Sequence, residues 1–204
     1  LTSIPFKVTH PYASFLVGGG SGSALGVQIM LLMPVTIKEL AGTAQAVSWM
    51  YALDAVLSLT LLYPLARWGE RYLQLETRVL AGVLTMAVSI AAMAWVHNVH
   101  AAFVVLSLFF IGSLIAEPAR EALLARFAKP QARASYMGMG RIGLAIGGLF
   151  GYTGGGALLD YARDHKLPAL PWISLAFVGL ATWLALRRQF APARNAAALR
   201  LKPV

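Results

Sequence analysis

Charged side chains are scarce in this sequence of 204 residues, and cysteine is absent altogether. Asp, Glu, Lys and Arg make up 12 % of the residues, whereas about a quarter is usual in soluble domains. Because 58 % of the residues are also hydrophobic, the composition argues against a soluble globular domain. The lack of cysteine excludes disulfides, thiol chemistry and Cys-ligated zinc. The four histidines are scattered without metal-ligand spacing, and we predict neither a metal nor a cofactor.

Six hydrophobic runs fill most of the chain, and most are close to the ~20 residues that a helix needs to cross ~30 Å of hydrocarbon. They cover roughly residues 12–37, 45–66, 79–96, 101–122, 136–159 and 170–186. This pattern predicts an all-α membrane protein with six transmembrane helices over residues 12–186. We expect residues 1–11 to be the end of a cytoplasmic linker within a longer chain, since the sequence begins without Met or a signal peptide. Residues 187–204 form a basic tail that can lie on the membrane as a short helix.

The net charge of +9 is distributed unevenly between the two sides of the predicted membrane helices. One side has thirteen Lys and Arg residues, in the first segment, the 66–78 and 120–135 loops and the tail. The other side has three, namely Lys38, Arg163 and Lys166. Because cytoplasmic loops retain Lys and Arg, both ends of the chain are expected in the cytoplasm. The basic residues flank helix ends, so we expect the lipid bilayer rather than nucleic acid as their partner.

Glycines recur at four-residue intervals in two of the runs, which is the spacing of a stripe along one helix face. The first run has Gly18, Gly22 and Gly26, and the fifth has Gly143, Gly147, Gly151 and Gly155. Small residues in such a stripe allow close helix packing in membranes. We therefore expect the fifth helix to be buried in a bundle.

Asp54 lies about halfway along the second run, with Tyr51 and Ser58 on the same helical face. An ionisable group inside a membrane helix is a candidate for function, and burial suits a carboxylic acid that takes up and releases protons. The three residues are candidates for proton coupling or for a substrate cavity, as is Gln28, more weakly. The alternative is a structural Asp that hydrogen-bonds to a neighbouring helix.

Glu117 and Arg141 are expected at the same depth, each about one turn inside one end of its helix. Matching depth predicts an ion pair, which is either a gating latch or a static bridge. We favour a gating or structural role over contact with substrate.

Gly19-Gly20-Ser21-Gly22 matches the G-x-S-G of rhomboid proteases, which are also built around six helices. These enzymes need a histidine on a later membrane helix to activate the serine. His97, His100 and His165 all fall in predicted loops, so we do not expect an enzyme.

The first basic loop contains Arg67-Trp68-Gly69-Glu70-Arg71, and the second basic stretch runs from Pro118 to Arg133. Both resemble connections of the major facilitator superfamily. Arg67, Gly69 and Arg71 match its G-x-x-x-D-R-x-G-R-R signature, although Ala66 replaces the acid. Pro118, Arg120 and Arg133 lie in a stretch that resembles the connection between the tenth and eleventh helices. Residues 50–64, 111–121 and 135–148 are similar to bacterial drug:proton antiporters of this superfamily.

The resemblance implies the C-terminal half of such a transporter, helices seven to twelve, built from two inverted three-helix repeats. Its partners would be a six-helix N-terminal half, protons and a small amphipathic substrate, and its location the bacterial inner membrane. The implied function is proton-coupled drug efflux by alternating access. A transporter of a metabolite and a non-transporting six-helix membrane scaffold remain alternatives, since a fold does not determine a substrate.

Overall fold

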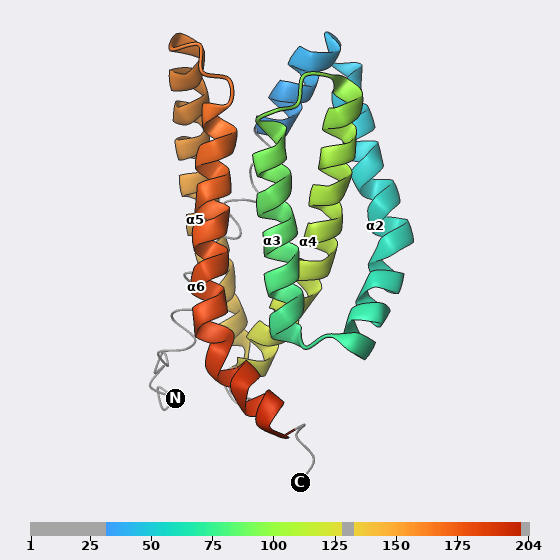
Figure 1. Cartoon of the computed structure of the whole chain (residues 1–204), viewed down its shortest axis with the longest axis vertical. Helices are drawn as coiled ribbons and strands as arrows, with labels where there is room; N and C mark the ends of the chain where they lie inside the picture. The colour runs from blue at the N-terminus through green and yellow to red at the C-terminus, as the bar shows by residue number, and fades with distance from the viewer. Residues whose placement is uncertain (1–31, 128–132, 201–204) are drawn as a thin grey trace.

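The computed structural model describes residues 32–127 and 133–200, and these residues form long helices without a strand among them (Figure 1). Residues 32–41 are a helical segment that turns at Gly42 into the next helix. The elements that follow are α2 (Gln45–Tyr72), α3 (Leu75–Met93), α4 (Val99–Phe127), α5 (Arg133–Asp164) and α6 (Leu170–Arg200). The predicted all-α class is confirmed. Most of the first predicted span, including Gln28 and the first glycine stripe, lies outside the described residues.

Four of the helices, α2, α3, α4 and α6, are long and apolar enough to cross a membrane. Several are longer than the hydrophobic runs that predicted them. At about 1.5 Å per residue, the 28 residues of α2 extend about 42 Å, which exceeds the ~30 Å hydrocarbon layer. The polar helix ends therefore extend into the headgroup regions.

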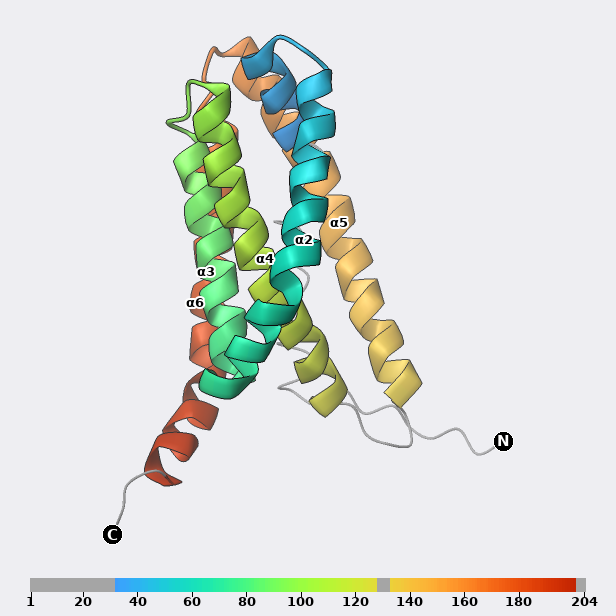
Figure 2. The same cartoon turned by 90° about the vertical axis from the view of Figure 1, so that its right-hand side faces the viewer.

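The predicted ends of the second and fourth helices are wrong. We expected the second to end near residue 66 and the fourth near residue 122, but α2 continues to Tyr72 and α4 to Phe127. Pro64 and Pro118 lie inside these helices. A proline removes one backbone N–H bond, and this loss is tolerated in membrane helices when the rest of the turn is satisfied. Figure 2 shows α2 bending in its lower part, as expected of a helix with an internal proline.

The basic tail is not a separate surface helix over its described residues. α6 continues without interruption from Leu170 to Arg200, beyond the predicted end at residue 186. Alanine and arginine dominate this extension, and both favour the helical state. The last turns of α6 extend below the other helices (Figures 1 and 2).

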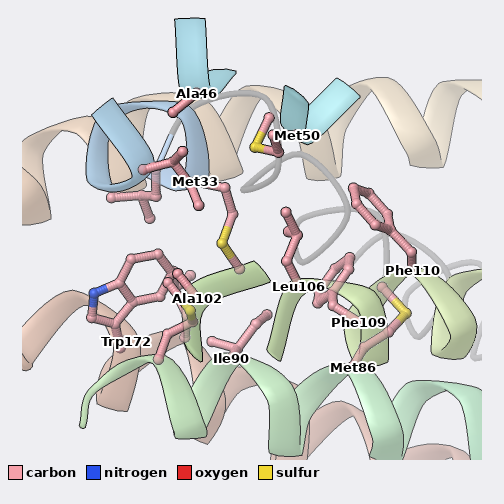
Figure 3. Close-up of a cluster of buried hydrophobic side chains, with 14 residues drawn as sticks. Met33, Ala46, Met50, Met86, Ile90, Ala102, Leu106, Phe109, Phe110 and Trp172 are labelled. Atoms are coloured by element: carbon pink, nitrogen blue, oxygen red, sulfur yellow. The ribbon is translucent and has the colours of Figure 1, made fainter. Parts of the chain in front are cut away.

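A buried apolar cluster joins α3, α4, α6, the start of α2 and the 32–41 segment (Figure 3). Phe109 and Leu106 of α4 lie at its centre and are fully buried, with Met33, Met50 and Met86 around them. Methionine adapts to irregular gaps between helices. A second cluster lies nearer the lower end of the bundle and joins α3, α4 and α6 only. It consists of Val79, Leu80, Val83, Ala119, Leu123, Leu124, Leu186 and Phe190.

α3 and α4 approach so closely that their backbones touch. A Cβ atom placed on Gly82 of α3 would lie 2.5 Å from the carbonyl oxygen of Gly112 in α4, and one placed on Gly112 would lie 2.9 Å from the carbonyl oxygen of Gly82. Only glycine fits at such a crossing. These two glycines therefore allow the close α3–α4 pair, against which α2 and α6 pack.

α5 contributes no fully buried side chain to either cluster among the described residues, and only Leu159 packs at the margin of the first. Its first residues stand apart from α3 and α6 (Figure 2). Gly147, Gly151 and Gly155 are buried, whereas Gly154 and Gly156 face open space. A packing role for the stripe of Gly143, Gly147, Gly151 and Gly155 stays a prediction.

The connections between helices alternate between two ends of the bundle. The turns before α2, between α3 and α4, and between α5 and α6 lie together at the top of Figure 1, which we call the upper end. The turn between α2 and α3 lies at the opposite, lower end (Figure 1). The helix bounds thus place Lys38, Arg163 and Lys166 at the upper end and Arg71, Arg126 and Arg187 toward the lower one.

Candidate functional site

One long face of α2 has little cover from the rest of the described chain. Its exposed side chains are large and apolar, and Leu59 is 85 % exposed. They follow one another at spacings of seven, three and four residues, which places them on one helical face, and comprise Trp49, Val56, Leu59 and Tyr63. An apolar face of this size marks contact with lipid, with a ligand or with another protein.

Asp54 lies beside this apolar face and is half-buried. Ser58, one turn further along α2, donates a side-chain hydrogen bond to the Asp54 carboxylate. Tyr51 lies one turn before Asp54 and is 43 % exposed. The three predicted residues therefore form a polar stripe on one side of α2, open to whatever faces this helix. A hydrogen-bonded carboxylate next to a hydroxyl can hold a proton or bind a cationic group.

The predicted ion pair between Glu117 and Arg141 is not formed. Glu117 instead binds Arg120 on its own helix, with 2.7 Å between carboxylate and guanidinium. Arg141 of α5 lies 3.9 Å from Glu121 of α4. Glu121 is one turn nearer the end of α4 than Glu117 and lies on the same face, within reach of the long Arg141 side chain. Equal depth therefore did not identify the partner of Arg141, since Glu117 already forms an ion pair with Arg120, three residues along its own helix.

The first group of signature residues lies at the lower end of α2. Arg67 donates a hydrogen bond of 3.1 Å to the Tyr63 hydroxyl, and the Arg71 guanidinium lies 5.6 Å from the centre of the Tyr72 ring. Gly69 is buried against Arg78 of α3, because a Cβ at Gly69 would lie 2.7 Å from the Arg78 Nε atom.

Arg78 is itself 3 % exposed, and its Nε has no hydrogen-bond acceptor in the described part of the chain. The glycine of the signature thus makes room for a buried guanidinium.

The second group lies around the end of α4. Pro118 is inside the helix, and Arg120 contacts both Glu117 and, at 3.6 Å, Glu121. Arg133 is the first residue of α5. Within residues 32–127 and 133–200, no group of three His, Asp or Glu side chains is arranged to hold a metal ion.

The sequence model of the Major Facilitator Superfamily matches residues 13–203, which is nearly the whole chain. The chain belongs to the Major Facilitator Superfamily. It is 51 % identical over 166 residues to the multidrug resistance protein MdtH of Proteus mirabilis (strain HI4320) and 53 % identical over 163 residues to that of Aeromonas salmonicida (strain A449). It is 50 % identical over 172 residues to MdtH of Escherichia coli (strain SMS-3-5 / SECEC).

These matches cover 80 to 84 % of this chain but only 41 to 43 % of each relative. The chain thus spans about two fifths of the length of the curated relatives it matches. This share agrees with one half of a Major Facilitator bundle, and the chain is a multipass membrane protein of transporter ancestry.

Sequence reasoning missed the contact between Gly82 and Gly112. A signal was available, since Gly112 and Ala116 are small residues four apart in α4, and both lie against Gly82. It also missed the pairing of Glu39 with Arg163, which joins the 32–41 segment to the end of α5. No local pattern links two residues that are 124 positions apart in the chain.

Proposed function

We propose that this chain is the C-terminal six-helix half of a proton-coupled exporter of small amphipathic molecules, drugs among them. The observation that carries this proposal is the open face of α2, where a hydrogen-bonded carboxylate lies beside large apolar side chains. The relatives are named multidrug resistance proteins, which supports drugs as the substrate class.

The chemistry of the α2 face suits this task. Apolar and aromatic side chains bind many amphipathic molecules without selecting one shape, and a few polar groups orient them. Asp54 provides the negative charge that either a proton or a cationic drug can neutralise. Because both compete for one carboxylate, uptake of a proton favours release of the drug, and the two bound forms favour opposite-facing states. Ser58 and Tyr51 orient the carboxylate and the substrate.

The experiment uses the full-length protein that contains this chain, in everted membrane vesicles with an imposed proton gradient. A drug that is exchanged for protons should collapse part of the gradient when it is added. Asp54→Asn should abolish at least nine tenths of this response, whereas Asp54→Glu should retain a measurable part of it because the acid is kept. Asp160→Asn serves as the matched control, since Asp160 is an exposed carboxylate near the C-terminal end of α5, away from the α2 face.

The outcomes separate three functions. If Asp54→Asn leaves the drug response and its pH dependence unchanged, Asp54 has a structural role. If wild-type vesicles respond to no drug but do respond to sugars, organic acids or amino acids, the protein transports a metabolite. If no solute affects the gradient and the purified protein binds none, the protein is a membrane scaffold.

We also propose that the lower end of the bundle, which has most of the Lys and Arg residues, faces the cytoplasm of the bacterial inner membrane. This chain contains no cysteine, so an introduced cysteine is the single labelling site within it. Gln74→Cys, in the turn between α2 and α3, should react with a membrane-impermeant maleimide only in everted vesicles. Asn98→Cys, in the turn between α3 and α4, should react only in intact spheroplasts. The reverse pattern would overturn the orientation.

A further inference from the structure

A cavity of about 360 Å³ lies at the upper end of the bundle, away from the α2 face. It is enclosed by the 32–41 segment, the end of α3, the end of α5 and the start of α6. Its volume is near the lower limit of about 300–1,000 Å³ for pockets that hold small organic ligands. None of the described residues proposed above for transport lines this cavity.

The walls of the cavity divide into an apolar part and a charged rim. Met93, Leu159 and Trp172 belong to the apolar part. Trp172 is almost fully buried, and Figure 3 shows its indole nitrogen pointing away from the neighbouring apolar side chains. Its N–H is a hydrogen-bond donor. An apolar lining that includes one N–H donor suits a chain or ring that ends in a polar group.

The charged rim has an excess of positive charge. Glu39 and Arg163 both line the cavity and form an ion pair with each other, so their charges cancel. Lys166 also lines it and forms no ion pair with a carboxylate of the described residues. Asp160 and Asp164, the nearest acids in the sequence, are not among the lining residues. Among the described residues that line the cavity, exposed Lys166 is thus the ammonium group without a carboxylate partner, and the His97 ring adds a hydrogen-bonding group.

The backbone of Lys166 adds an independent observation. Its φ angle is +55°, the only positive value for a residue other than glycine in the described chain. The turn is closed by hydrogen bonds from Leu167 N–H to the Ala162 carbonyl, 2.8 Å, and from Lys166 N–H to the Arg163 carbonyl, 3.2 Å. Glycine is usual at this position of a helix end, and Gly42 (φ +69°) ends the 32–41 segment in that way. Lys166 therefore adopts a left-handed conformation at a steric cost, and such strained positions cluster at ligand-binding sites.

We propose that this cavity binds an anionic amphiphile, with its acid group on Lys166 and its apolar part against Met93, Leu159 and Trp172. The acid group comes either from a lipid of the surrounding bilayer or from a free amphiphile in solution, because the position at the bundle end is open to both. Charge-assisted hydrogen bonds from Lys166 and donors from Trp172 and His97 hold the acid group. This site is separate from the α2 face and needs no proton gradient.

Binding is measured on the full-length protein in nanodiscs of zwitterionic phosphatidylcholine, with 11-bromoundecanoate as the probe. Bromine quenches tryptophan fluorescence at short range, and the Trp172→Phe variant identifies the part of the signal that comes from Trp172. We expect saturable quenching of this part by the acid, and binding at least tenfold weaker for its uncharged methyl ester.

Lys166→Gly is the decisive variant. Glycine adopts φ +55° without strain, so the folded protein should be at least as stable, yet the acid should bind about tenfold more weakly. Lys166→Arg keeps the charge and should bind within about twofold of wild type. The control variant is Lys38→Gln, at the same bundle end but outside the cavity lining, and it should bind the acid as wild type does. Glutamine is used because Lys38 lies within a helix, which glycine would weaken.

Ala94→Phe fills the cavity from the end of α3 and should abolish the Trp172 signal. The proposal is overturned if the acid and its ester bind equally, if Lys166→Gly binds like wild type, or if Ala94→Phe leaves quenching unchanged. Phosphatidylglycerol in the nanodiscs then identifies the source. Competition with the probe indicates an anionic lipid as the natural ligand, and undiminished quenching indicates a free amphiphile.

Discussion

The contact between α3 and α4 differs from the contacts of α5 in what lies at the interface. α3 and α4 meet backbone to backbone at Gly82 and Gly112, and side chains from both fill the two buried clusters. α5 contributes little to these clusters, and its described ion pairs reach Glu121 of α4 and Glu39 of the 32–41 segment.

Both regions contain glycines, yet glycine has a different consequence in each. At Gly82 a neighbouring backbone occupies the space that a side chain would need, whereas Gly154 and Gly156 have nothing within 4 Å of a Cβ atom. A glycine-rich helix is therefore not a closely packed helix by composition alone. What decides is whether another backbone faces the glycine.

The largest effect is expected from Gly82→Ala. Its Cβ would lie 2.5 Å from the Gly112 oxygen and 2.6 Å from the Ala116 Cβ, and a backbone cannot move aside as a side chain can. We expect a loss of ~3 kcal/mol or more in the free energy of unfolding, or no folded protein. Thermal unfolding of the full-length protein in detergent provides the measurement.

Gly154→Ala is the matched control for this change. Its new methyl group meets open space, and alanine favours the helix by ~1 kcal/mol over glycine, so stability should stay the same or rise. Equal destabilisation by the two substitutions would mean that the contrast between the two regions is wrong.

A smaller effect is expected from Gly69→Ala at the lower end of α2. The obstacle here is the Arg78 side chain, 2.7 Å away at Nε, and a flexible side chain can shift. We expect a loss of ~1 to 2 kcal/mol. In an Arg78→Ala background the same substitution should cost much less, because the guanidinium is gone. Urea or detergent unfolding of the four variants gives the coupling free energy, and additive losses would show that Gly69 and Arg78 do not interact.

The smallest effect is expected at the pair of Glu121 and Arg141, which joins α4 to α5. The two groups are 3.9 Å apart and partly exposed, so the pair contributes less than ~0.5 kcal/mol. Arg141→Glu should lower stability slightly, and Glu121→Arg in the same protein should restore it. The matched combination of Arg141→Glu with Glu117→Arg should give no rescue, since Glu117 binds Arg120. Rescue by the second combination would instead support the pairing that the sequence predicted.

Much of the architecture was predictable because it depends on local properties of the chain. The length of a hydrophobic run determines whether a helix crosses a membrane, and the charge of a short loop can be counted directly. The extents of the helices were less predictable. The second and fourth runs were expected to end near residues 66 and 122, yet α2 and α4 continue past the apolar layer to Tyr72 and Phe127.

The candidate site likewise has a part that the sequence predicted and a part that it did not. Tyr51, Asp54 and Ser58 share a face because they belong to one helix, and helical periodicity alone places them together. The partners of Glu117 and Arg141 depend on the rotation and offset of two helices, and equal depth did not identify them. The cavity near Trp172 needs four separate elements to enclose it.

The amino-acid sequence was enough to identify a helical membrane protein of the Major Facilitator Superfamily, with a carboxylate inside its second helix. The helices and the carboxylate follow from composition, run length and spacing along one chain segment, whereas the family follows from the resemblance of the basic loops and from the family match. The tertiary structure was needed to show which glycines meet a backbone, which acid meets Arg141, and that Lys166 has no carboxylate partner among the described residues. Such contacts depend on distances between helices, and residues far apart in the sequence carry no local record of those distances.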